Sequence, residues 1–312
     1  MIRTRPLGRS GLAVSELALG TWAFGGDEWG PPDDRVAGAT IEAALQAGIN
    51  LIDTADVYGY GHSEELVGAV LAGADCEVFV CSKAGNDIYD TPRQAGGGPK
   101  SFGADYVRRA IDGSLRRLRR DRIEVYLLHN PSLDVLERGE AMGALVAARD
   151  AGALLLVGAS VYTAAEGRAA LEAGADVLMI THNLLNHDES LALLSVASER
   201  GCAVLARSVL ANGLLTGKYD RTARFAEDDH RSHRGDAWLQ SAMDRIEAIR
   251  PIAERHGLPL RDLALAYALT DPRLAGVVVG ARSPEQLASL LAVTDQAPLR
   301  TEILAELAAG VG

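Results

Sequence analysis

Four residues of this sequence, Asp53, Tyr58, Lys83 and His129, have side chains that together could pass a proton to a carbonyl oxygen. A free tyrosine has a pKa of about 10, and a nearby lysine ammonium stabilises the phenolate and lowers that pKa. A carboxylate beside the lysine would hold the ammonium in place and keep it charged. We therefore expect a tyrosine that gives or takes a proton near neutral pH, and a histidine that donates a hydrogen bond to the substrate oxygen.

This set suits the reduction of a carbonyl group, and because no side chain supplies a hydride, a nicotinamide cofactor would be needed. Each residue also has a structural interpretation. Asp53 could cap the following loop, Lys83 could lie along the surface with its charge in solvent, and His129 could be an ordinary hydrogen-bonded strand-end histidine. Their positions at or just beyond successive strand ends favour the catalytic interpretation.

The elements that must position these side chains follow a repeated pattern. At Gly48, Gly152, Gly174 and Gly201, helix-like sequence ends in a glycine and a short apolar run follows at once. Glycine adopts the left-handed conformation just after a helix most easily. Runs that are apolar on both faces are typical of a parallel sheet covered by helices, so the alternation predicts βα units.

Eight such runs are predicted to be strands. They are Leu17–Gly20, Leu51–Asp53, Val78–Lys83, Glu124–His129, Leu155–Ser160, Val177–His182, Ala203–Ser208 and Gly276–Val279. Eight units in 312 residues predict an α/β fold, a closed (β/α)8 TIM barrel forming a single domain over residues 1–312. A doubly wound sheet would need G-x-G-x-x-G after the first strand, which residues 20–26 (GTWAFGG) do not match.

Polar side chains stand at the ends of the predicted strands, where a barrel gathers them around one pocket. They are Asp53, Lys83, His129, Ser160, His182, Arg207 and Ser208. Two long connections, 84–103 and 209–237, also follow strands. Structureless stretches of this length are uncommon unless they form binding loops, so we expect both on the C-terminal rim beside the site.

The segment after the last strand predicts a phosphate site. Ser283 is a good N-cap, Pro284 a good first helical residue, and Gln286 would complete a capping box. A helix N-terminus binds phosphate, and the guanidinium of Arg282 adds a fixed positive charge. Taken alone, the segment is better explained as an ordinary capped surface helix, and only its place after the last strand favours the phosphate site.

Charge and composition limit the partners. With 31 basic and 42 acidic residues the net charge is −11, which disfavours nucleic acid. The one basic cluster, Arg116, Arg117, Arg119 and Arg120, is interpreted as the solvated face of a helix. No run is long and apolar enough for a membrane helix and no signal peptide is recognised, so we expect a cytoplasmic protein with no membrane partner.

The three cysteines, Cys76, Cys81 and Cys202, have no zinc-type spacing, and we predict no metal site. Cys81 and Cys202 lie in or beside apolar runs and are interpreted as small core residues in a reducing compartment. No heptad or exposed apolar helix face indicates an oligomeric state.

Several segments resemble the aldo-keto reductase family from Arg5 to Val293. They are PLGRSGLAVSELALGTW, LIDTADVYGYGHSEELVG, SLRRLRRDRIEVYLLHNP, RSVLANGLLTGKY and GARSPEQL. The resemblance implies a (β/α)8 barrel that uses NADPH, less often NADH, without a metal. Asp53, Tyr58, Lys83 and His129 match the catalytic tetrad, with Tyr58 as the acid/base.

The same resemblance implies a set of cofactor contacts. They are Thr21, Trp22, Ser160, Arg207, Ser208, Leu210, Gly280, Arg282 and Gln286. Arg282 would favour a 2′-phosphate, hence NADP. The chain departs from the family at three positions: Val161 replaces a usual asparagine, Met179 a usual glutamine, and Leu290 another asparagine.

These inferences predict an NADP(H)-dependent enzyme that reduces a small-molecule aldehyde or ketone to an alcohol. The same residues fit a dehydrogenase that acts on a sugar or secondary alcohol. A cofactor-binding sensor subunit with little turnover is a second class, motivated by Val161 and Met179. A lyase or isomerase using His129 and Lys83 without nicotinamide is a third.

Overall fold

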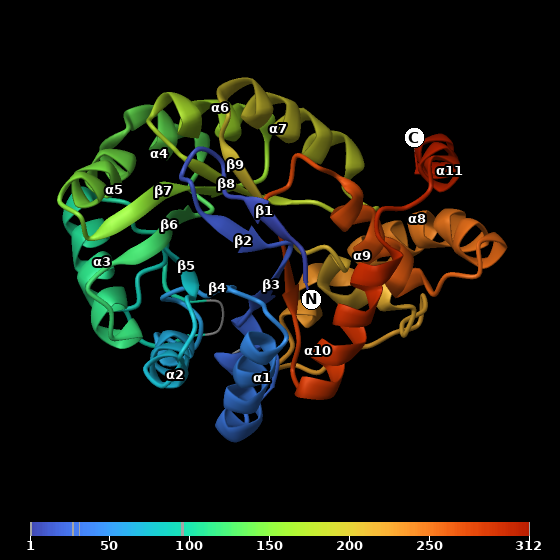
Figure 1. The fold of residues 1–312 in the computed structure, drawn as a ribbon, viewed down its shortest axis with the longest axis horizontal. Coiled ribbons are helices and arrows are strands. Elements are labelled where there is room, and N and C mark those ends of the chain that lie inside the picture. Colours follow the sequence, from blue (N-terminus) through green and yellow to red (C-terminus); the bar gives the residue numbers. More distant parts are fainter. Residues whose placement is uncertain (1, 27, 31, 95–96, 312) are drawn as a thin grey trace.

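Eight parallel strands close into a barrel at the centre of the computed structural model, which describes residues 2–26, 28–30, 32–94 and 97–311 (Figure 1). Neighbours around the barrel follow the order β10-β3-β4-β5-β6-β7-β8-β9. The strands are β3 (Leu17–Gly20), β4 (Leu51–Asp53), β5 (Phe79–Ala84), β6 (Ile123–His129), β7 (Leu154–Val161), β8 (Val177–Thr181), β9 (Ala203–Arg207) and β10 (Gly276–Gly280). The predicted (β/α)8 barrel is therefore confirmed.

Helices surround the barrel, with α8 and α11 packed together outside it (Figure 1). The α-helices are α1 (Asp34–Gln46), α2 (His62–Leu71), α3 (Ala104–Leu118), α4 (Leu133–Arg138), α5 (Glu140–Asp150), α6 (Ala164–Glu172), α7 (His187–Arg200), α8 (Gly235–Arg255), α9 (Leu260–Thr270), α10 (Pro284–Leu291) and α11 (Thr301–Val311). Short 3-10 helices are η1 (Trp22–Phe24), η2 (Ala211–Thr216), η3 (His230–Arg234) and η4 (Ala292–Gln296). The glycines predicted to end helices, Gly48, Gly152, Gly174 and Gly201, have left-handed φ values between 65° and 98°.

The predicted strand bounds agree with the structure to within one residue at each end. Because Val177 and Met179 of β8 belong to the barrel interior, alternation turns Thr181 toward the interior and His182 toward the helices. The His182 ring stacks on Tyr267 of α9, with ring centroids 5.2 Å apart and an interplanar angle of 9°. The expectation that His182 joins the pocket is therefore wrong.

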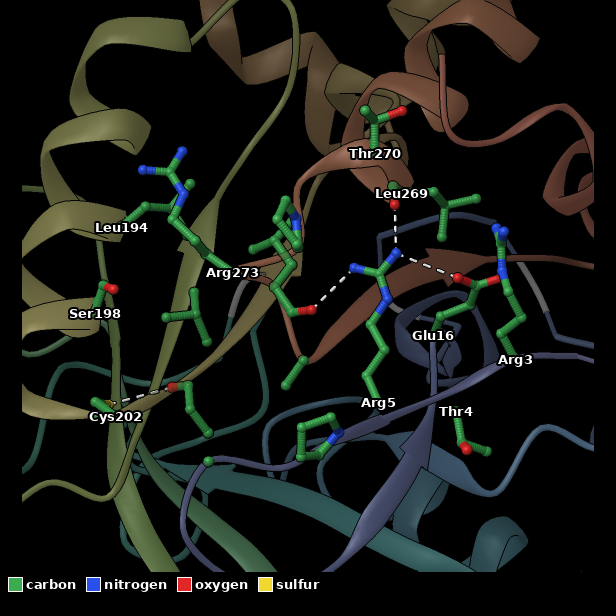
Figure 2. A pocket seen from close by; sticks show the side chains of 18 of the residues that line it. Arg3, Thr4, Arg5, Glu16, Leu194, Ser198, Cys202, Leu269, Thr270 and Arg273 are labelled. Carbon is green, nitrogen blue, oxygen red and sulfur yellow. Dashed lines mark hydrogen bonds and ion pairs between the residues drawn. The ribbon is translucent and has the colours of Figure 1, made fainter. Parts of the chain in front are cut away.

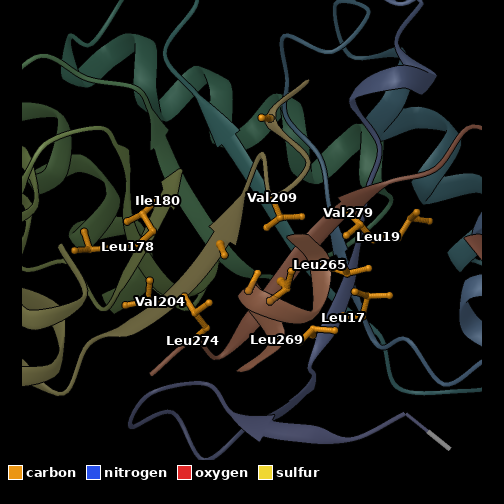
Figure 3. Packing of buried hydrophobic residues seen from close by; sticks show 14 of the residues in the cluster. Leu17, Leu19, Leu178, Ile180, Val204, Val209, Leu265, Leu269, Leu274 and Val279 are labelled. Carbon is orange, nitrogen blue, oxygen red and sulfur yellow. The ribbon is translucent and has the colours of Figure 1, made fainter. Parts of the chain in front are cut away.

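Two apolar clusters fill the molecule. The first lies between the barrel and the helices, where outward-facing residues such as Leu19 and Ile180 pack with Leu265 of α9 (Figure 3). The second fills the barrel interior with residues such as Leu51, Cys81 and Leu127. Side chains alternate between the two faces of a strand, so the residue two positions after each of these also points into the barrel interior. Those residues lie at the C-terminal end of the barrel.

A two-stranded antiparallel hairpin, β1 (Thr4–Pro6) and β2 (Ala13–Ser15), closes the N-terminal end of the barrel. The sequence analysis missed it because each strand has only three residues. Leu7 and Val14 from the hairpin are buried in the interior cluster. Beside the hairpin lies a cavity of about 720 Å³, which we call the lower cavity, and the Arg5 side chain points across it toward Glu16 and Leu269 (Figure 2).

The basic cluster at the end of α3 is not a uniformly solvated face. Arg117 donates from Nε to the buried Glu64 at 2.7 Å, and its side chain is only 14% exposed. Arg120 donates to Glu124 at 3.0 Å and to the Val78 carbonyl at 2.9 Å. Two of the four arginines therefore tie α3 to α2 and to the barrel, because long guanidinium side chains reach back to buried carboxylates.

Within the part of the chain that the structure describes, no helix is both long and apolar enough to cross a membrane. All three cysteines are free: Cys81 is buried, Cys202 is partly buried and Cys76 is exposed. Cys202 packs against the hydrophobic core, which agrees with its interpretation as a small core residue.

Candidate active site

A cavity of about 1150 Å³, which we call the upper cavity, opens at the C-terminal end of the barrel. Among the predicted site residues, the ones that line it are Trp22, Asp53, Tyr58, Lys83, His129, Arg207, Ser208, Leu210, Gly280, Arg282 and Gln286. Thr21 and Ser160 lie behind this surface. Both long connections also contribute to the lining, so their predicted location on this rim is confirmed.

Lys83 and Asp53 form a buried ion pair on adjacent strands. The Lys83 ammonium lies 2.7 Å from Asp53 Oδ1 and also donates to the Thr54 carbonyl at 2.7 Å. Burial disfavours the charged form of Lys83, but the Asp53 carboxylate and Tyr58 together hold its pKa above the ordinary value. Lys83 therefore stays charged although its side chain is only 1% exposed.

Tyr58 stands on the connection from β4 to α2, beside Lys83 and His129. The Lys83 ammonium lies 5.2 Å from the centroid of the Tyr58 ring, and the His129 ring meets it edge-on at 5.9 Å. Burial raises the pKa of Tyr58 to about 12, and Lys83 only partly opposes this effect. The expected lowering toward neutral pH is therefore not found, because desolvation of the phenolate outweighs the nearby charge. The phenol is protonated at neutral pH.

His129 is an uncharged imidazole. Burial, reinforced by the charges of Lys83, Lys100 and Arg207, holds its pKa well below the usual value. Its Nδ1 atom is buried without a hydrogen-bond partner. A neutral imidazole has one N–H donor and one acceptor, so His129 retains capacity to bind a polar group that enters the cavity.

Hydroxyl groups and close backbone contacts position the Tyr58 loop. Thr21 Oγ1 lies 2.7 Å from Ser63 Oγ and donates to the Asp53 carbonyl at 3.0 Å, so Thr21 ties this loop to β4 from behind the cavity. A Cβ atom added at Gly25 would lie 2.5 Å from the Gly59 nitrogen. That backbone approach places Trp22 against Tyr58, with ring centroids 6.1 Å apart.

Ser160 acts on the cavity through its neighbours. Its hydroxyl accepts from Arg207 Nε at 3.0 Å and donates to Asn130 Oδ1 at 2.9 Å. Arg207 also lies over the Tyr162 ring, 4.6 Å from its centroid. Asn130 lines the cavity and was missed by the sequence analysis, although as a polar residue directly after His129 it carried the same strand-end signal.

On the opposite rim, the N-terminus of α10 carries Arg282 and Gln286. Ser283 Oγ accepts from the Gln286 N–H at 3.3 Å, as predicted. The return bond differs, because Gln286 Oε1 accepts from the Arg282 N–H at 2.9 Å rather than from Ser283. The predicted capping box is therefore only half formed, and the Gln286 side chain instead orders the Arg282 backbone beside the cavity.

The three departures from the family pattern are buried. Val161 and Met179 are 0% exposed and Leu290 is 4% exposed, and none is among the described residues that line the upper cavity. Thr181 and Asn183 do line it, and neither was predicted. Asn183 binds the Ser208 carbonyl and the Leu185 N–H through its side chain, whereas Thr181 offers a hydroxyl from the end of β8.

The second long connection packs against an aromatic wall rather than standing free. Trp22 and Trp29 meet edge to face at 5.3 Å, and the His230 ring lies 4.6 Å from each. Arg231 lies over the ring of Trp29, among others, and pairs with Asp229 at 2.6 Å. These contacts hold Trp29 beside the mouth of the cavity.

Comparisons with known proteins agree with this geometry. Residues 16–310 match the Aldo/keto reductase family. The chain is 31% identical over 300 residues to the aldo-keto reductase YhdN of Bacillus subtilis, covering 91% of this chain and 86% of that protein. It is 29% identical to a probable voltage-gated potassium channel subunit beta of Oryza sativa, covering 95% and 92%. Among solved structures, the glycerol dehydrogenase of Gluconobacter oxydans superposes with a TM-score of 0.83 at 30% identity, covering 98% and 94%.

Proposed function

The chain belongs to the aldo/keto reductase family, oxidoreductases that act on carbonyls, and on that premise we propose that it reduces an aldehyde or ketone with NADPH, with Tyr58 as the proton donor. One observation carries the proposal: Tyr58 lies in the upper cavity beside the Asp53–Lys83 ion pair and His129, with the Lys83 ammonium 5.2 Å and the His129 ring 5.9 Å from the centroid of its ring. Among the described residues no cluster of His, Cys, Asp and Glu could hold a metal ion, so the proposal uses none.

The cavity residues fit a nicotinamide dinucleotide. The lining runs from the buried tetrad to the α10 N-terminus, where Arg282 and ordered backbone suit a phosphate. Arg207, Ser208 and Leu210 lie along β9 and the connection after it, and Thr181 and Asn130 offer polar groups to a carboxamide. When bound, the nucleotide would supply the hydride. Arg282 supports NADPH, with NADH as the alternative.

The side chains of this chain would handle the proton. Tyr58 and His129 would both bind the carbonyl oxygen of the substrate, which fixes the carbonyl in place and polarises it. When the carbonyl is reduced, the O–H bond of Tyr58 would break and its proton would move to the carbonyl oxygen, which gives a neutral alcohol. Lys83, held by Asp53, would stabilise the phenolate left on Tyr58.

The protonated form of Tyr58 is the form that donates a proton in carbonyl reduction. Oxidation needs the phenolate as base, and a pKa of about 12 leaves almost none of it at pH 7. Because one structural neighbour is named a glycerol dehydrogenase, oxidation of an alcohol is the alternative direction of the proposed reaction. Because one relative is named a probable voltage-gated potassium channel subunit beta, a cofactor-binding subunit with little turnover is the second candidate function.

A nucleotide titration tests the proposal first, and all three tryptophans of the chain line the upper cavity. Saturable quenching of tryptophan fluorescence by NADPH, weaker with NADH, is the expected result. Tyr58→Phe should then lose at least 100-fold in kcat while the NADPH Kd is unchanged. The matched control is Tyr60→Phe on the same loop, whose hydroxyl bonds to Gln94 outside the cavity.

Two outcomes would count against this mechanism. A fully active Tyr58→Phe variant would remove Tyr58 as the acid. Tight NADPH binding without reduction of any carbonyl would favour the cofactor-binding subunit instead.

A further inference from the structure

The upper cavity is positively charged although the protein as a whole carries a net charge of −11. Among the described residues that line it, six are basic and two are acidic. The basic residues are Lys83, Lys100, Arg207, Arg234, Arg245 and Arg282, and the acidic ones are Asp53 and Glu28. An anionic ligand is therefore favoured in this cavity, and the nucleotide alone accounts for only part of that charge.

The basic residues lie on two sides of the barrel mouth. Arg282 follows β10, whereas Lys100 packs against the end of β6 at His129. In the ring of eight strands, β6 is four places from β10 in either direction, so these two cations face each other across the mouth. A nucleotide phosphate held at Arg282 would leave Lys100 on the side where the substrate must meet Tyr58 and His129.

The connection from β5 to α3 holds Lys100 in place. An isolated antiparallel β-bridge pairs Asn86 with Lys100, and Ser101 N–H donates to the Gly85 carbonyl at 3.0 Å. The Lys100 ammonium donates to Asn86 Oδ1 at 2.8 Å and to the His129 carbonyl at 2.7 Å. An ammonium has three donors, so one remains for a ligand.

Lys100 lacks the counter-charge that Lys83 has. Lys83 is paired with Asp53 at 2.7 Å, whereas both side-chain partners of Lys100 are neutral oxygens. No carboxylate in the described ranges lies within ion-pair distance of Lys100. Burial lowers the pKa of Lys100 to about 8, with Asp56 raising it and Arg207 lowering it further. An unpaired, partly desolvated ammonium gains from an incoming anion.

We propose that the substrate is a carbonyl compound with an anionic group, a phosphate ester or a carboxylate, which Lys100 binds while the carbonyl lies at Tyr58 and His129. This inference rests on the proposed reductase function. Lys100 acts here as a specificity-determining residue, and its bond to the His129 carbonyl fixes the distance between the anion and the reacting oxygen.

Matched substrate pairs test the proposal on the NADPH-loaded enzyme. One pair is glyceraldehyde 3-phosphate and glyceraldehyde, and the other is succinic semialdehyde and butanal. The expected result is at least a tenfold higher kcat/KM for the charged member of one pair, and the pair that shows it separates a phosphate from a carboxylate ligand. Equal kcat/KM values within both pairs would overturn the proposal and leave the reductase function intact.

Variants assign the preference to Lys100. Lys100→Met should lower the charged-to-uncharged ratio about tenfold, and Lys100→Arg should restore it. The chain has only three lysines, and Lys218, exposed and outside the cavity lining, provides the matched control. Lys218→Met removes the same charge and should leave the ratio unchanged. A Lys100→Met variant that keeps the full preference would refute the assignment.

The pH profile adds a readout that a purely structural lysine would not move. Burial and the charge of Arg207 lower the pKa of Lys100 to about 8 against the opposing effect of Asp56, and His129, whose carbonyl Lys100 binds, has a pKa well below its usual value. The preference should therefore weaken between pH 7 and 9 in the wild type and persist in Lys100→Arg, because arginine stays protonated. A wild-type preference that is flat over this range argues against Lys100 as the anion ligand.

A binding experiment separates failure of this inference from failure of the proposed function. Calorimetry with NADP-saturated protein would compare glycerol 3-phosphate with glycerol, and 4-hydroxybutyrate with butanol. Tighter binding of an anionic member, lost in Lys100→Met, supports the anion site even if no carbonyl is reduced. Equal binding within both pairs overturns it whatever the turnover.

Discussion

The two ends of the barrel each hold a cavity lined with basic side chains, but the two cavities differ in whether their polar groups have hydrogen-bond partners. In the lower cavity the Arg5 guanidinium donates to Glu16 and to the carbonyl of Leu269 (Figure 2). It also donates to the carbonyls of Asp271 and Leu274. In the upper cavity, Nδ1 of the lining residue His129 is buried without any partner.

This difference distinguishes a structural cluster in the lower cavity from the binding site that we propose in the upper one. A buried polar group left without a hydrogen bond costs about 1–3 kcal/mol, so folds rarely keep one without reason. In the lower cavity Arg3 and Arg5 share Glu16, and Arg273 pairs with Asp271, which ties the hairpin and α9 to the barrel. The upper cavity keeps a polar atom, Nδ1 of His129, without a hydrogen-bond partner, and a bound ligand would supply that partner. Positive charge alone therefore does not identify a site.

The largest effect is expected from Lys83→Met in the upper cavity. This change should lower kcat by about 1000-fold, because the phenolate of Tyr58 loses its counter-charge. It also leaves Asp53 buried and unpaired, which should cost about 3–5 kcal/mol of folding free energy. Steady-state kinetics and urea unfolding measure the two effects. Adding Asp53→Asn should recover stability but not activity, and recovery of both would contradict the assigned roles.

In the lower cavity, Glu16→Gln should lower stability but leave activity nearly unchanged. It removes the carboxylate that Arg3 and Arg5 share at 2.8 and 3.2 Å. Breaking this largely buried network should lower the free energy of unfolding by about 2–4 kcal/mol, with kcat within twofold of the wild type. Urea unfolding and an activity assay check it together. A large loss of kcat in the folded variant would mean that the lower cavity serves the reaction.

Acid should destabilise the fold through His182, which packs against α9 and lines neither cavity. Burial lowers the pKa of His182 to about 4, below the ordinary 6.5. The unfolded chain then binds more protons, so this contribution to stability is complete above pH 6.5 and is lost as pH falls toward 4. His182 alone should account for about 2 kcal/mol between pH 7 and 5.

Urea unfolding of His182→Gln at the two pH values measures that contribution. The variant should lose about 2 kcal/mol less than the wild type between pH 7 and 5. Equal losses would show that His182 is not held uncharged in the folded protein.

The smallest effect concerns the rim at α10. Arg282→Ala should raise the Kd for NADPH about tenfold and leave the Kd for NADH nearly unchanged, because only NADPH carries a 2′-phosphate. Fluorescence titration measures both values. Arg273→Ala, at the lower cavity, is the matched control, and equal weakening by the two variants would remove Arg282 from the nucleotide site.

The sequence alone predicted the barrel and the four residues Asp53, Tyr58, Lys83 and His129 that lie together in the upper cavity. Short runs that are apolar on both faces record burial on both sides of a parallel strand, so Leu17–Gly20 and Leu51–Asp53 were placed to the residue. Strand alternation is equally local. It directed Asp53, Lys83 and His129 to one interior without any knowledge of the neighbouring strands.

Only the tertiary structure decided the charges and the contacts between distant segments. The pKa of Tyr58 depends on how completely other parts of the chain exclude water, and that burial reversed the expected shift. Lys100 lies at the mouth of the upper cavity because a β-bridge to Asn86 folds the long connection back on itself. No periodic pattern in the sequence predicts that bridge. His182, the residue directly after β8, faces α9 and stacks on Tyr267 instead of pointing into the cavity. Periodicity is a property of neighbouring residues, whereas desolvation and loop closure are properties of the assembled fold.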